Sequence, residues 1–181
     1  LQQQVFAMVQ ALDDELDQIQ VWRSSLLQAH RDGLEAIEAN PVHSPDFELM
    51  VKDALTQLWG GPKLSQSELR RMSAVQQAMA VNDNVPVKAI RAVLQQAIER
   101  LKPEGPRSMT SAEWLIYNIL DLRFVQGYKI RDVVRRLAVS ESDYYRKQRV
   151  AIEQVAQTLA QMERDANQNM QQAQGMLASK R

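Results

Sequence analysis

Six prolines divide this chain into segments and constrain its fold more than any other feature. They stand at positions 41, 45, 62, 86, 103 and 106. At each position the helical pattern of apolar residues also breaks, as expected because proline interrupts a helix interior. Between the prolines, apolar residues recur at intervals of three and four, which is the spacing of one helix face. We therefore predict an all-α protein built as a helical bundle.

The same breaks suggest four segments. We expect a long acidic amphipathic helix over residues 1–40, a small helical bundle over 44–102, a trihelical domain over 108–165 and a glutamine-rich tail over 166–181. The tail is predicted to be either a helical extension or disordered. A chain of 181 residues with 45% apolar content has enough material for one medium core or two small ones.

The first segment resembles one helix of a coiled coil. Its apolar residues Val5, Val9, Leu12, Leu16 and Ile19 alternate spacings of four and three. Such a helix needs a partner helix, which a second copy, the chain's own carboxy-terminal helix or another protein would supply.

Charge is distributed unevenly although the net charge of the chain is zero. Residues 1–50 hold nine acids and two bases, a balance of −7, so the remainder carries +7. An acidic segment of this kind can repel nucleic acid, bind a basic partner or fold back over a basic surface. The sequence leaves these alternatives open.

Three helices are expected in the middle of the chain. The first runs from Asp46 to Trp59 and stops at Gly60-Gly61-Pro62, and the second starts at Ser65 or Ser67 and reaches about Met79. The third begins at Pro86, after the turn at residues 82–84, and ends at Leu101. Residues 102–108, with two prolines and a glycine, are the predicted domain boundary.

Two helices meeting at a tight corner are predicted in the carboxy-terminal third. Thr110 or Ser111 caps a preceding helix in which Trp114 and Phe124 are expected to pack in the core. The apolar residues of the next helix are Ile130, Val133, Val134 and Leu137. Ser140 stands at the start of the following helix, where its hydroxyl can cap the first turn while Asp143 completes a variant of the capping box.

This region resembles the fourth region of bacterial sigma factors and the related helix-turn-helix of bacterial regulators. The resemblance covers roughly residues 111–160. It rests on Leu122-Arg123-Phe124 with Gly127, on Arg131-Asp132-Val133, on the corner from Leu137 to Ser140, and on Ala151-Ile152 with Val155. The family usually has Ala at position 134 and Gly at position 138, where this chain has Val and Ala. A residue other than Gly at a corner with positive φ costs up to about 1 kcal/mol.

A helix-turn-helix places the first residues of its second helix against the edges of DNA bases, while nearby Lys and Arg side chains bind phosphates. The expected base-facing residues are Glu141, Ser142, Tyr145 and Arg146. The expected phosphate contacts are Lys129, Arg131, Arg135, Arg136, Lys147 and Arg149. Residues 121–150 contain eight basic and four acidic residues, a local net charge of +4, which favours nucleic acid as the partner. The alternative is a protein-docking unit whose arginines form a solvated face.

Other functional classes find little support in the sequence. The chain has no cysteine, and its two histidines, His30 and His43, fall in no metalloprotease spacing. Asp13, Asp14 and Asp17 lie opposite the apolar face and indicate a solvated surface. We therefore expect no enzyme activity, no cofactor, no metal and no small-molecule substrate.

No apolar run reaches the roughly 18 residues of a membrane span, so a soluble, cytoplasmic protein is expected. Because the chain starts at Leu1 without a methionine, we expect that the natural amino terminus lies upstream or was removed.

The sequence thus predicts a bacterial, sequence-specific DNA-binding transcription regulator or accessory factor. Its expected partners are double-stranded DNA and either a second copy, giving a homodimer, or a helical protein. The alternative is a helical interaction subunit of a larger complex, whose helix-turn-helix docks protein.

Overall fold

The structure, a computed structural model, describes residues 18–32, 40–60 and 62–178. These residues form helices and turns, with no strand among them. The chain divides into two compact units, Leu1–Asn40 and Pro41–Arg181. The predicted all-α class is confirmed.

The first unit contains a helix over residues 18–32 whose side chains are all exposed. Its apolar residues Ile19, Trp22 and Leu26 follow helical spacing and are between 50 and 68% exposed. Most of the predicted coiled-coil pattern, from Val5 to Leu16, lies outside the described residues.

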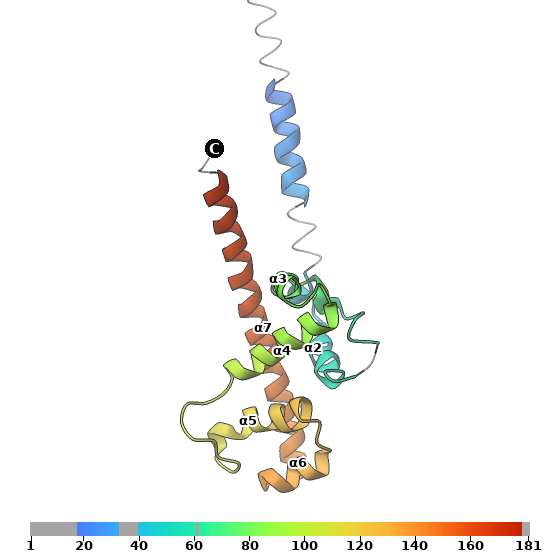
Figure 1. Cartoon of the computed structure of the whole chain (residues 1–181), viewed down its shortest axis with the longest axis vertical. Helices are drawn as coiled ribbons and strands as arrows, with labels where there is room; N and C mark the ends of the chain where they lie inside the picture. Colours follow the sequence, from blue (N-terminus) through green and yellow to red (C-terminus); the bar gives the residue numbers. More distant parts are fainter. Residues whose placement is uncertain (1–17, 33–39, 61, 179–181) are drawn as a thin grey trace, which may run out of the picture. The chain divides into compact units, whose positions relative to one another are not determined.

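The second unit packs short helices around the first two thirds of one long helix, α7 (Figure 1). Helix α7 (Glu141–Ala178) contacts all five shorter α-helices: α2 (Phe47–Thr56), α3 (Ser73–Val81), α4 (Pro86–Arg100), α5 (Ala112–Leu120) and α6 (Ile130–Leu137). The 3₁₀ helices η1 (Pro41–His43) and η2 (Glu68–Arg71) and the π-helical turn η3 (Asp121–Val125) complete the unit. Within the described ranges, no helix combines the length and the apolar character needed to cross a bilayer.

One large hydrophobic core runs through this unit. It extends from Phe47 in α2 to Met162 in α7 and includes the α4 face that helical spacing predicts, Ala89, Ile90, Val93, Leu94, Ala97 and Ile98. Trp114 and Phe124 are buried in it, so their prediction as packing residues is confirmed. Residues 102–108, the predicted domain boundary, therefore connect two parts of the same core. The physical reason is the length of α7, which packs against α5 and against α2, α3 and α4.

The helix predicted from Ser65 or Ser67 to Met79 is wrong, because two elements occupy this stretch. Ser67 caps only the short η2, accepting from the backbone N–H of Leu69 at 3.3 Å. Met72 then takes an extended conformation with ψ 137° and is fully buried. Helix α3 starts afresh at Ser73, where a carboxylate from α7 caps it.

The capping carboxylate belongs to Glu163, which is only 3% exposed. Its two oxygens accept from the backbone N–H groups of Ser73 and Ala74 at 2.8 and 2.9 Å. An anion at a helix amino terminus is favoured by the helix dipole and by unsatisfied N–H groups. This contact ties the middle of α7 to α3. Beyond it α7 continues to Ala178, so the described part of the tail is a helical extension, one of the two predicted alternatives.

Candidate nucleic-acid interface

A three-residue corner joins α6 to α7 at the predicted position. Helix α6 ends at Leu137 and α7 begins at Glu141. Between them Ala138 has φ 52° and ψ 41°, the left-handed conformation that glycine adopts most easily. The chain therefore keeps a tight corner although it has Ala where the resembled family has Gly.

The predicted cap on α7 is half formed. The hydroxyl of Ser140 accepts from the backbone N–H of Asp143 at 3.1 Å, as expected for a capping serine. The Asp143 carboxylate, however, accepts from the guanidinium of Arg146 at 2.5 Å and leaves the capping box incomplete. Both side chains of this ion pair are largely exposed, so the pair is worth little and does not prevent Arg146 from binding another group.

A small separate core holds α5, α6 and the start of α7 together, and we call these elements the trihelical unit. Its buried members are Ile119, Leu122, Val133, Leu137 and Tyr144. The Tyr144 side chain is fully buried, and this burial raises its pKa to about 12. Gln148 donates to the Tyr144 hydroxyl at 3.0 Å. The angle between α6 and α7 is thus fixed by packing on both sides of the corner.

A π-helical turn places α6 relative to α5. In η3 the backbone N–H of Gln126 donates to the carbonyl of Asp121 at 2.8 Å, one residue further than in an α-helix. Gly127 then leaves the helix with φ 74°. The indole N–H of Trp59, just after α2, donates to the carbonyl of Val125 at 2.6 Å. The trihelical unit is therefore anchored to the larger bundle at this turn.

A partly buried polar network beside the turn was not predicted from the sequence. The Asp121 carboxylate accepts from Arg107 at 2.7 Å and from Gln126 at 2.6 Å. Arg107 also donates to the side-chain carbonyl of Asn118, whose amide donates to the backbone carbonyl of Ser108. The signal in the sequence is the pair Asn118 and Asp121, two polar residues inside the otherwise apolar run from Trp114 to Leu122.

The predicted base-facing residues divide into two groups. Ser142 and Arg146 are exposed and, four residues apart, share the outer face of α7 with Arg149. Glu141 is exposed at the first position of the helix. Tyr145 is 52% exposed but lies on the side of α7 that lines a groove with α2. The structure therefore separates Tyr145 from Ser142 and Arg146, while Arg149 borders both their face and the groove that Tyr145 lines.

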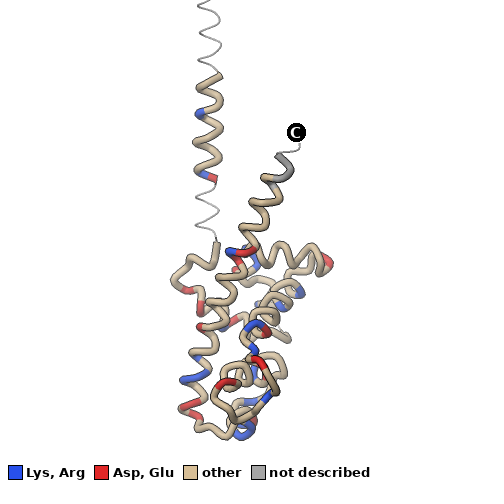
Figure 2. The backbone as a smooth tube through the Cα atoms, turned by 90° about the vertical axis from the view of Figure 1, so that its left-hand side faces the viewer, with Lys and Arg blue, Asp and Glu red and all other residues tan. Residues whose placement is uncertain are grey.

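The predicted phosphate contacts lie on the N-cap residue of α6, on α6 and on the first turns of α7, at the end of the second unit where Lys and Arg are interspersed with Asp and Glu (Figure 2). Among them Lys129, Arg131, Arg135 and Arg149 are exposed and form no ion pair with any described residue. Lys147 is half-buried.

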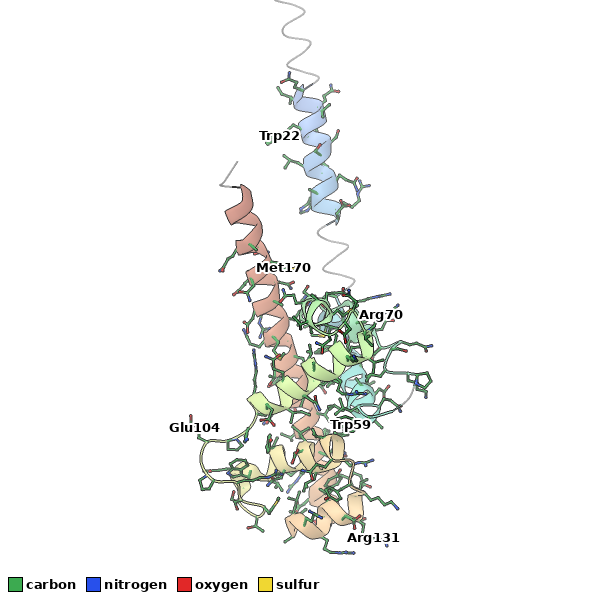
Figure 3. The ribbon with its side chains drawn as sticks, in the orientation of Figure 1. Trp22, Trp59, Arg70, Glu104, Arg131 and Met170 are labelled. Atoms are coloured by element: carbon green, nitrogen blue, oxygen red, sulfur yellow. The ribbon has the colours of Figure 1, made fainter. Side chains whose placement is uncertain are left out.

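Arg136 differs from the other predicted phosphate contacts because its guanidinium stacks over the ring of Tyr128, 4.2 Å from the ring centre. Arg70, an exposed cation in η2, lies at the opposite end of the unit from Arg131 (Figure 3). The two therefore do not share one surface.

Across the described ranges, no group of three His, Asp or Glu side chains is placed to hold a metal ion. Asp13, Asp14 and Asp17 lie outside those ranges. Comparisons of the chain with protein-family models, with curated proteins and with solved structures found no match.

Proposed function

We propose that this protein is a sequence-specific DNA-binding transcription regulator or accessory factor. The trihelical unit reads the major groove with the first turns of α7. Ser142 and Arg146 reach base edges, while Lys129, Arg131, Arg135 and Lys147 hold phosphates.

The observation that carries this proposal is the exposed face of α6 and α7 beside the corner at Ala138. Six of its basic residues, Lys129, Arg131, Arg135, Arg136, Lys147 and Arg149, form no ion pair within the described residues, and the exposed Arg146 has only a weak partner. Guanidinium and ammonium groups left without protein partners are available to phosphates and to guanine edges. The corner and the small core beneath it hold these groups on a rigid support.

Fluorescence anisotropy of a labelled random duplex, titrated at several salt concentrations, tests the proposal. We expect salt-sensitive binding, because each phosphate contact releases counterions. Arg135→Ala and Lys147→Ala should each weaken binding to all sequences and lower the slope of log affinity against log salt by about 0.9. Arg146→Ala should instead reduce the preference for a selected site over random duplex by about 1–3 kcal/mol.

Arg164→Ala is the matched control. Arg164 is exposed on the same helix, bonds only to the nearby Gln161 and lies five turns beyond Arg146, so its removal changes the net charge equally. Equal binding by all four variants and the parent would refute the site assignment. The absence of binding at low salt would refute the proposed function.

A helical interaction subunit is the second candidate function. It is favoured by the exposed stripe of Ile19, Trp22 and Leu26 on the helix over residues 18–32. Light scattering after size exclusion separates the two cases. A stable dimer that binds DNA favours the regulator, whereas an aggregating chain that binds no DNA favours a subunit without its partner.

A further inference from the structure

A groove of about 380 Å³ runs between α2 and the first turns of α7. Helix α2 lines it with Glu48, Leu49 and Lys52, and α7 lines it with Tyr145, Gln148 and Arg149. The groove therefore borders the outer face of α7 on one side. No sequence pattern indicated it, because its walls come from segments about 100 residues apart.

The chemistry of the groove is that of a phosphate and sugar site. The groove is lined by two basic residues, Lys52 and Arg149, and one acidic residue, Glu48. Neither Lys52 nor Arg149 forms an ion pair with a described residue. The Tyr145 hydroxyl can donate a hydrogen bond. Leu49, 58% exposed, offers an apolar surface for a sugar ring. The excess positive charge suits an anionic ligand with an apolar side.

The position of α2 selects one such ligand. The major groove is about 12 Å wide and admits a single helix. When the Ser142 and Arg146 face of α7 enters it, the neighbouring α2 and the groove residue Arg149 lie toward the rim, where the phosphates of one strand run. One DNA strand can then lie along the mouth of the groove that the two packed helices form.

We propose that this groove holds the sugar-phosphate backbone of one DNA strand, with Lys52 and Arg149 on its phosphates. Tyr145 then contacts the backbone and reads no base. This inference rests on the proposed function and extends it, because it makes α2 part of the DNA-binding surface.

Charge variants of α2 provide the first test, with the same random duplex and salt series. Lys52→Ala should weaken binding several-fold at low salt and lower the salt slope by about 0.9. Glu48→Gln should strengthen binding, since it removes the one acid in the groove. Tyr145→Phe should weaken binding to every sequence equally and leave sequence preference unchanged. Lys88→Ala is the control, because Lys88 lies in α4, outside the groove and the trihelical unit, where it pairs with Asp83.

Proximity can be tested directly because the chain contains no cysteine. The variants Lys52→Cys and Lys88→Cys each carry one thiol, to which iron-EDTA can be attached. Hydroxyl radicals from position 52 should cleave the bound duplex several-fold more than those from position 88. At protein concentrations that saturate the duplex, this readout does not depend on how far either substitution changes affinity.

The outcomes separate the two proposals. Stronger cleavage from position 52, together with the expected charge effects, supports the groove as a strand site. If Arg135→Ala and Lys147→Ala weaken binding but the Lys52 and Glu48 variants match Lys88→Ala, the groove assignment is overturned and the proposed function stands. If the parent protein binds no duplex at low salt, both are overturned.

Discussion

Ala138 bears the conformational cost of the corner between α6 and α7. Its φ of 52° is unfavourable for any residue with a β-carbon, and its side chain is exposed, so no packing depends on it. We expect Ala138→Gly to raise the free energy of unfolding by up to about 1 kcal/mol, measured by urea denaturation.

The control for this substitution is Ala160→Gly, in the middle of α7. There glycine has no conformational advantage and also loses a partly buried methyl group, so it should lower the free energy of unfolding by at least about 0.5–1 kcal/mol. If Ala138→Gly destabilises the protein as Ala160→Gly does, residue 138 is not left-handed in solution.

Tyr144 makes the stability of the protein depend on alkaline pH. Burial raises its pKa to about 12, whereas a tyrosine in the unfolded chain ionises near pH 10. The native state therefore keeps a proton that the unfolded state releases. The resulting stabilisation is complete below about pH 10 and is lost as the pH rises from about 10 to about 12.

Tyr144→Phe should remove this part of the pH dependence. The free energy of unfolding of the parent should fall more steeply than that of the variant between about pH 9 and pH 11. Urea denaturation at both values measures the difference, with the half-exposed Tyr145 substituted by Phe as the control. Parallel curves for the parent and Tyr144→Phe would contradict the assignment.

At the scale of elements, Glu163 joins α7 to the start of α3. Glu163→Ala would leave the N–H groups of Ser73 and Ala74 without their acceptors in a half-buried position. We expect the free energy of unfolding to fall by about 2–3 kcal/mol. Glu163→Gln keeps one acceptor oxygen and should cost less. Glu153→Ala, on an exposed position of the same helix, should change stability little, and a similar loss in both alanine variants would argue against the cap.

The elements that the sequence predicted well are those determined by local signals. Helix α4 begins at Pro86 as predicted and buries the predicted face, because proline fits a first helical turn and the apolar spacing is regular. The corner at residues 138–140 was also placed correctly, since Ser140 is a local capping signal. Such features need only neighbouring residues.

The features that were missed depend on residues far apart in the chain. The break at Met72 requires Glu163, some 90 residues later, to cap α3. The π-helical turn at Asp121 is held by Arg107 and by Trp59 through Val125. In the candidate interface, Tyr145 lines a groove with α2, which lies about 100 residues earlier in the chain. No periodicity within one segment contains this information.

At the scale of the whole molecule, charge separates the two units. Residues 1–40 contain seven acids and two bases, which leaves 20 bases and 15 acids, a net charge of +5, on residues 41–181. The large core lies within the second unit, so that unit has its own packing when residues 1–40 are removed. The acidic segment is therefore expected to act on DNA binding mainly through charge.

Removing residues 1–40 should tighten binding to random duplex at low salt. The gain should shrink as salt rises, because the Debye length falls to about 10 Å at 0.1 M and screens the repulsion of DNA by the acidic segment. Anisotropy titrations of both chains measure the gain, and thermal unfolding verifies that the shortened chain is folded.

The full chain with Asp13→Asn, Asp14→Asn and Asp17→Asn is the control. If these substitutions reproduce most of the gain, charge is responsible, whereas a gain seen only on truncation indicates that the segment physically covers the interface. If the shortened chain binds DNA no more tightly at low salt, residues 1–40 neither repel DNA nor cover the interface. Binding of a partner protein would then be the remaining role for this segment.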